Sequence, residues 1–234
     1  MSQVPDKPGT SAAVAAFLNK VGQIGAVKTA PGRRGRLLFT VDATASRQHT
    51  WDAACTLQAE MFLASRDLGG LAVSLAYYRG FHEFAATPFL TDTAELARRM
   101  AQVTCLGGRT QIDRALRHAL EETRREPIQA MVFVGDAVEE EVDPLCHLAG
   151  ELRIRGTPVF VFHEGHDAAA GEAFRQIASL SGGAYAPFDH GSAGALRDLL
   201  RAVAVFAAGG RRALAALPGP TARRIAGQLP APKG

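Results

Sequence analysis

Four short apolar segments divide the middle of the chain: Leu37–Val41, Leu71–Tyr77, Met131–Val134 and Val159–Phe162. Their length and nearly continuous apolar character are typical of strands that are buried on both faces of a sheet. Strands with one solvated face would alternate between apolar and polar residues instead. The pattern therefore predicts four buried, mainly parallel strands. Phe81–Ala85 follows the second segment after an Arg-Gly turn, which predicts a hairpin and one antiparallel edge strand.

Apolar residues between these segments recur at intervals of three and four positions, which predicts helices that cover the sheet. The stripes are Trp51, Ala54, Cys55, Met61 and Phe62; Ile112, Ala115, Leu116, Ala119 and Leu120; and Leu196, Leu199, Leu200 and Val203. We therefore predict a doubly wound α/β fold, with a mostly parallel sheet, one antiparallel edge strand and helices on both faces. In such folds ligands collect beyond the carboxyl ends of the strands.

The two ends of the chain differ from this alternating body. Residues 1–35 contain a predicted helix from Ser11 to about Gln23 and a basic Pro-Gly-Arg-Arg-Gly-Arg linker. Residues 36–208 form the predicted domain. Residues 209–234 are basic and interrupted by Pro and Gly, so we expect a tail that is too broken for a long helix.

Charge is distributed unevenly over the 234 residues. Residues 1–36 and 209–234 carry +5 each, so the net charge of +3 leaves −7 for residues 37–208. An acidic body does not favour nucleic acid as a partner. No stretch approaches the roughly 20 apolar residues of a membrane span, no secretory signal is evident, and three cysteines are typical of reduced thiols. We expect a cytoplasmic protein.

Oxygen-bearing side chains gather in the loops where ligands are expected. Asp42, Thr44 and Ser46 follow the first predicted strand, and Asp136 follows the third. Thr110 comes after two glycines and opens a predicted helix. Carboxylate and hydroxyl oxygens favour a hard cation such as Mg²⁺ or Mn²⁺, with Ca²⁺ as a further candidate, whereas zinc usually takes Cys or His. The sequence therefore predicts a divalent cation site at one edge of the sheet.

These residues make the chain resemble the von Willebrand factor A domain over roughly residues 36–208. The metal-ion-dependent adhesion site of that family is written Asp-x-Ser-x-Ser, then a Thr, then an Asp. The resemblance implies that Thr44, Ser46 and Thr110 are hydroxyl ligands and that Asp42 and Asp136 act partly through water. It departs from the family pattern at Thr44, where Ser is usual, and after Asp136, where Ala137 replaces the commoner Gly or Ser.

The resemblance also implies a function without catalysis. In the family the cation keeps one open position, which takes a carboxylate from a partner protein. Intracellular bacterial members often act beside an AAA+ ATPase of the MoxR type or in assembly complexes. We therefore expect a partner that presents Asp or Glu, and no nucleic acid.

Other interpretations of the same residues remain open. Thr110 and Asp113 also fit a helix-capping pair, and the acidic residues Glu139–Glu141 fit the first turn of a helix. The segment from His163 to Asp167 fits a polar loop better than a zinc site. For the whole chain, the alternatives are a scaffold with a degenerate metal site and, less favoured, a metal-dependent phosphatase with Asp42 as nucleophile.

Overall fold

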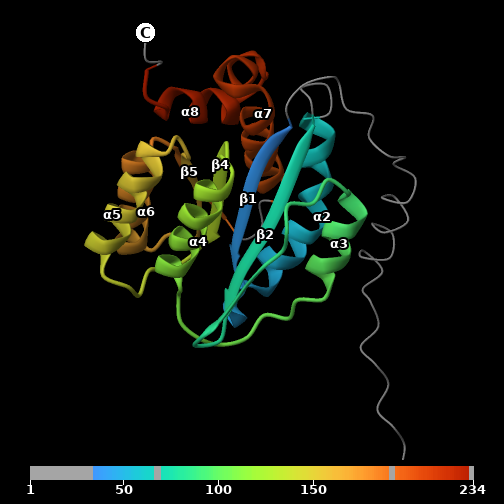
Figure 1. The fold of residues 1–234 in the computed structure, drawn as a ribbon. Coiled ribbons are helices and arrows are strands. Elements are labelled where there is room, and N and C mark those ends of the chain that lie inside the picture. The colour runs from blue at the N-terminus through green and yellow to red at the C-terminus, as the bar shows by residue number, and fades with distance from the viewer. Residues whose placement is uncertain (1–33, 66–69, 190–192, 232–234) are drawn as a thin grey trace, which may run out of the picture.

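The computed structural model of the protein describes residues 34–65, 70–189 and 193–231. The helix predicted from Ser11 to Gln23 lies outside them. A six-stranded sheet with the order β3-β2-β1-β4-β5-β6 forms the centre of the molecule (Figure 1). Its strands are β1 (Gly35–Asp42), β2 (Leu71–Arg79), β3 (Glu83–Ala86), β4 (Ala130–Gly135), β5 (Val159–Glu164) and β6 (Tyr185–Phe188).

The four apolar segments are β1, β2, β4 and β5, as predicted, and they pair in parallel. The predicted hairpin is also confirmed, because β3 pairs antiparallel with β2 at the edge of the sheet. One further strand, β6, was not predicted, and it pairs in parallel with β5. It is four residues long and contains Pro187, a residue that sheets tolerate mainly at an edge.

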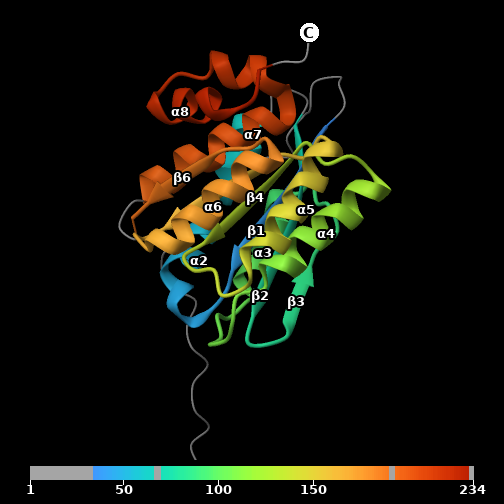
Figure 2. The ribbon, with the colours of Figure 1, turned by 90° about the vertical axis from the view of Figure 1, so that its left-hand side faces the viewer.

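Helices cover both faces of the sheet, as Figures 1 and 2 show. One face packs against α4 (Ile112–Arg125), α5 (Val142–Ile154) and α6 (Ala168–Ser181). The other packs against α2 (Gln48–Ser65), α3 (Thr93–Ala101), α7 (Ala193–Ala216) and α8 (Pro220–Gln228). A short 3-10 helix, η1 (Ala45–Arg47), precedes α2. No helix within the described ranges is both long and apolar enough to cross a membrane.

The segment after residue 208, expected as a tail, extends the packed body. α7 continues to Ala216 across a kink at Gly210, where φ is 69°, and α8 follows. Leu214 and Ile225 are fully buried in the core, and Gln228 exchanges hydrogen bonds with the backbone of Tyr185. The glycine and proline interruptions divide this segment into short helices, and their apolar residues still bury against the domain.

The connectivity of the sheet determines where a ligand can bind. From β1 the chain first builds β2 and β3 on one side, and then crosses to build β4, β5 and β6 on the other. The loops that leave β1 and β4 therefore diverge and open a crevice at the carboxyl edge between these two neighbours. Asp42 ends β1, and Asp136 directly follows β4.

Candidate functional site

Asp42 is held in a fixed orientation at the carboxyl end of β1. Its side chain is almost fully buried. The Thr44 backbone N–H donates to Oδ1 at 2.8 Å, and the Tyr78 hydroxyl donates to Oδ2 at 3.2 Å. Tyr78 is opposite Asp42 in the parallel pairing of β1 with β2. Both carboxylate oxygens therefore have a donor from the protein.

These donors do not fully compensate for burial of the Asp42 charge. Desolvation raises the pKa of Asp42 to about 6, and the nearby Asp136 carboxylate adds to the rise. The Thr44 hydrogen bonds and the positive charge of Arg47 act in the opposite direction. A buried carboxylate with a raised pKa would gain from a further positive charge beside it.

A buried ion pair lies beneath the first loop. The Arg47 guanidinium has no exposed surface and pairs with Glu164 at the end of β5. The Thr50 hydroxyl also donates to Glu164. Burial lowers the pKa of Arg47, while the carboxylates of Asp136 and Asp42 act to raise it. This ion pair ties the η1 turn to the far side of the crevice.

Thr110 connects its own loop to the loop that follows β4. Its hydroxyl donates to Glu140 at 2.5 Å and accepts the Glu139 backbone N–H at 3.0 Å. The Thr110 backbone N–H donates to the Glu139 carboxylate at 2.8 Å. A hydroxyl has one proton and two lone pairs, so these bonds leave one lone pair for another ligand.

The helix-capping interpretation of Thr110 with Asp113 is wrong. The Glu140 carboxylate accepts the backbone N–H groups of Ile112 and Asp113 at the start of α4, and the Asp113 side chain pairs with Arg117. Glu140 therefore takes the position of a helix cap although it comes from another loop. The prediction that Glu139–Glu141 lie in the first turn of a helix is wrong, because α5 begins at Val142 and only Asp143 of the acidic residues lies in its first turn.

Four of the five predicted site residues line one hollow of about 240 Å³ at the carboxyl edge: Asp42, Thr44, Thr110 and Asp136. Gly107, Gly108 and Glu139 also line it. The Ser46 side chain lies outside the described part of the structure. Across that part, no group of three or more Cys, His, Asp or Glu residues is arranged to hold a metal. Any cation here would therefore need hydroxyl ligands together with the two aspartates.

The polar segment after the fourth predicted strand is not entirely a loop. His163 and Glu164 belong to β5 and are buried, and the His163 ring hydrogen-bonds the Tyr185 hydroxyl at 2.8 Å. Asp167 caps α6 by accepting the Ala170 N–H at 2.7 Å. His163, Glu164 and Asp167 therefore each take part in a structural contact of the fold.

The sequence analysis missed the residues that support the site. Tyr78, Arg47, Glu164 and Glu140 all lie around the predicted ligands. Two signals were available in the sequence: the charged residue Arg47 directly after Ser46, and the tyrosine Tyr78 directly after the predicted strand Leu71–Tyr77. The roles of Glu140 and Glu164 depend on contacts across 30 and 114 positions of the chain, and no local pattern indicates them.

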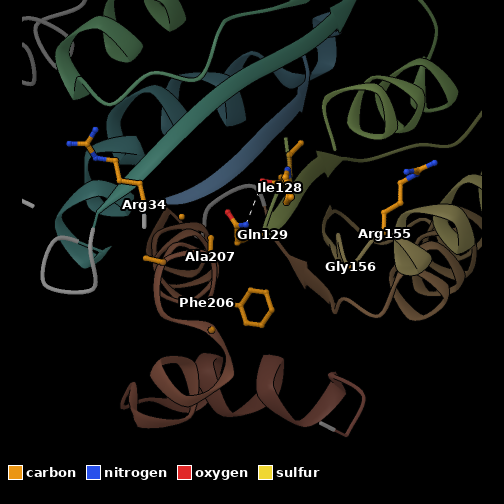
Figure 3. Close-up of a pocket in the computed structure, with 11 residues that line it drawn as sticks. Arg34, Ile128, Gln129, Arg155, Gly156, Phe206 and Ala207 are labelled. Atoms are coloured by element: carbon orange, nitrogen blue, oxygen red, sulfur yellow. Dashed lines mark hydrogen bonds between the residues drawn. The ribbon is translucent and has the colours of Figure 1, made fainter. Parts of the chain in front are cut away.

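A second, larger hollow of about 320 Å³ lies at the amino edge of the sheet (Figure 3). Gly35, Ile128, Gln129, Phe206 and Ala207 are among its lining residues. The guanidinium groups of Arg34 and Arg155 extend in opposite directions at its two sides. This hollow lacks the convergent side-chain oxygens that line the one at the carboxyl edge.

Comparison with known proteins finds similarity of structure only. No family model matches the chain, and no curated protein matches its sequence. A von Willebrand factor type A protein from Catenulispora acidiphila superposes with a TM-score of 0.62 at 16% identity over 77% of this chain. The VWA domain of SpRpn10 superposes with a TM-score of 0.56 at 12% identity over 67% of this chain.

A third similar structure is proximal thread matrix protein 1 from the mussel byssus, whose adhesion-site motif is occupied by zinc. It superposes with a TM-score of 0.58 at 15% identity over 73% of this chain. The chain spans 44% of the Catenulispora protein, 46% of the mussel protein and 89% of the SpRpn10 domain. At these identities the comparisons establish a common fold.

Proposed function

We propose that this chain, which has the fold of von Willebrand factor A domains, is a protein-binding module that grips an acidic side chain of its partner through a divalent cation. Asp42, Thr44, Ser46, Thr110 and Asp136 would hold the cation. When bound, such an ion supplies a positive charge that attracts a carboxylate. Because three of the five residues bring neutral hydroxyls, the ion would remain electrophilic enough to attract a partner's Asp or Glu.

The observation that carries this proposal is the state of Asp42. Its carboxylate is buried, its pKa is raised to about 6, and it shares a hollow with Asp136 and two threonines. The residues that line the hollow offer oxygen atoms and include no Cys or His, which fits a hard cation such as Mg²⁺. The zinc in the mussel protein is a precedent for a divalent ion on this fold.

Catalysis is less well supported by the same residues. In the phosphatase alternative Asp42 would be the nucleophile, but Thr44 stands where phosphatases of the haloacid dehalogenase type have a second Asp. Burial raises the pKa of the Cys55 thiol to about 12 and that of Cys105 to about 11, so neither is activated as a nucleophile. We therefore favour a partner that is bound and left unchanged.

One observation favours the scaffold alternative. The buried Arg47 guanidinium already supplies positive charge to Asp42 and Asp136, and Thr110 spends two of its three hydrogen-bonding positions on Glu139 and Glu140. A site with these features could keep its shape without an ion. In that case partner binding would not depend on metal.

A pull-down tests this proposal: the tagged full chain captures partners from a lysate of the cells in which the protein naturally occurs. We compare Mg²⁺, a chelator, and the variants Asp42→Ala and Thr110→Ala in Mg²⁺. The proposal predicts partners that are present only for the wild type in Mg²⁺; a MoxR-type AAA+ ATPase is the candidate that the sequence resemblance suggests. The same partners in all four samples would contradict it and favour the scaffold.

A further inference from the structure

Two large apolar side chains are exposed beside the candidate metal site. Phe81 is 64% exposed and Leu106 is 45% exposed. Within the described ranges, the other large apolar residues with comparable exposure are Ile154 and Leu180, near the carboxyl ends of α5 and α6. Single exposed apolar residues need no explanation, but two beside one site can indicate a contact surface. We name Phe81 and Leu106 the apolar rim.

Backbone hydrogen bonds attach the apolar rim to the loops of the site. The Leu106 N–H donates to the carbonyl of Ala43, between Asp42 and Thr44, at 3.0 Å. The Arg109 N–H donates to the Gly80 carbonyl, next to Phe81, at 3.2 Å. Leu106 is followed by Gly107 and Gly108, which line the hollow themselves. The apolar rim therefore lies in the loops that border the hollow.

Side-chain contacts brace the hairpin that carries Phe81. The Gln111 amide lies 3.3 Å from the carbonyls of Arg79, Gly80 and Glu83, and Arg114 donates to the His82 carbonyl at 2.8 Å. These bonds hold the β2–β3 turn against the loop before α4. A turn whose backbone is already held in place loses little backbone conformational entropy when a partner packs on it.

Arginines lie in the loops around the apolar rim, and the nearby carboxylates of Glu83, Glu139 and Glu140 are already engaged by other groups of the protein. Arg79 is paired with Glu83. Arg109 and Arg114 are exposed and form no ion pair with any residue that the structure describes. Positive charge beside exposed apolar surface complements a segment that carries both acidic and apolar side chains.

We propose that the apolar rim is a specificity surface for an acidic partner segment in which a bulky apolar residue lies close in sequence to the Asp or Glu that the metal site takes. The proposal rests on the proposed function, because the carboxylate positions the segment. In this proposal the hollow binds the acidic side chain of the partner. Phe81 and Leu106 bind the apolar residue next to it, and so distinguish one acidic segment from another.

The probe is a library of blocked synthetic peptides with one central Glu and randomised flanking positions, bound to the full chain in Mg²⁺. We expect the wild type to enrich Phe, Leu, Ile or Met near the Glu. A selected peptide should bind about fivefold or more tightly than its Ser-substituted counterpart, the usual effect of an apolar anchor. Phe81→Ser/Leu106→Ser should lose this preference and still bind Glu peptides in Mg²⁺. Ile154→Ser/Leu180→Ser, the matched control, should keep it.

Two results would overturn the proposal and leave the proposed function standing: selection of Glu without apolar neighbours by the wild type, or the same apolar preference in Phe81→Ser/Leu106→Ser. Binding of apolar peptides that is equally strong without Glu and in a chelator would overturn the link to the metal site. Failure of the wild type to select any Glu peptide in Mg²⁺ would count against the proposed function as well. All variants change exposed side chains, and unchanged thermal unfolding would verify that they fold.

Discussion

The two edges of the sheet each carry a hollow, and they differ in what lines it. At the amino edge the larger hollow, of about 320 Å³, is bounded by backbone, by Phe206 and by arginines that extend away from each other. At the carboxyl edge a smaller hollow, of about 240 Å³, brings together Asp42, Asp136 and two threonines from three loops. The proposed site therefore lies at the edge where polar groups converge, and not at the edge with the larger cavity.

The two edges also differ in how many charged side chains they bury. The carboxyl edge buries the charges of Asp42, Arg47 and Glu164, while Arg155 at the amino edge is exposed. Buried charges usually weaken a fold unless they are paired, so an edge that concentrates them is more readily explained by function than by stability.

The largest expected effect is that of removing one partner of the buried ion pair. Arg47→Met would leave Glu164 buried without its counter-charge, which typically costs about 3–5 kcal/mol. Arg155→Met at the amino edge changes an exposed residue, and we expect an effect within about 0.5 kcal/mol. Urea unfolding of both variants measures the difference.

A double variant separates the ion pair from simple loss of packing at Arg47. Arg47→Met/Glu164→Gln removes both charges, so it should recover part of the stability that Arg47→Met loses. If the single and the double variant lose the same free energy of unfolding, the unpaired charge of Glu164 is not the cause of the loss.

The next largest effect is on the pH dependence of stability, which depends on Asp42 in the metal-free protein. Its folded-state pKa of about 6 lies above the unfolded value of 3.8, so the folded state holds a proton more tightly. Stability from this group is therefore full below about pH 4 and is lost as the pH rises to 6 and above, by on the order of 3 kcal/mol. Asp42→Asn cannot ionise. In a chelator it should gain about 2 kcal/mol over the wild type between pH 4.5 and pH 7.5, as measured by urea unfolding, because roughly a third of the loss occurs below pH 4.5. A difference that is independent of pH would rule out the raised pKa.

A smaller effect distinguishes glycines at the two edges. A Cβ on Gly108 would lie 2.0 Å from the Gly80 carbonyl oxygen, and one on Gly35 would lie 2.3 Å from that of Ala207, so each Ala variant should lose about 1–3 kcal/mol. Gly107→Ala is the control, since no atom lies within 4 Å of its added Cβ. In calorimetric unfolding, Gly107→Ala should be more stable than both Gly108→Ala and Gly35→Ala. Equal stability of the three variants would mean that neither contact is tight.

Much of this architecture could be predicted from the sequence because it depends on local patterns. Continuous apolar runs indicated β1, β2, β4 and β5, and their parallel arrangement placed the residues after β1 and β4 at one edge. Asp42 and Asp136 could be found in this way. β6 could not, because four residues with a proline carry no clear periodicity.

The supporting residues could not be predicted because their roles depend on tertiary contacts. Glu140 caps a helix that precedes it in the chain, and it bonds a threonine 30 positions away. From the sequence, the acidic run was expected in the first turn of a helix. In the structure, the carboxylates of Glu139 and Glu140 instead accept hydrogen bonds from Thr110. Local patterns indicate the ligands of such a site more readily than the residues that orient them.

Titration calorimetry with Mg²⁺ tests the central claim most directly, namely that the carboxyl edge holds a divalent cation. Because a metal must displace the proton of Asp42, the wild type should bind one Mg²⁺ at pH 7.5 and about tenfold more weakly at pH 5.0. Asp42→Asn should lose most of the binding at both pH values, and Arg155→Met at the amino edge should keep it. Mg²⁺ binding that Asp42→Asn leaves unchanged, or no binding by the wild type at millimolar Mg²⁺, would contradict the account.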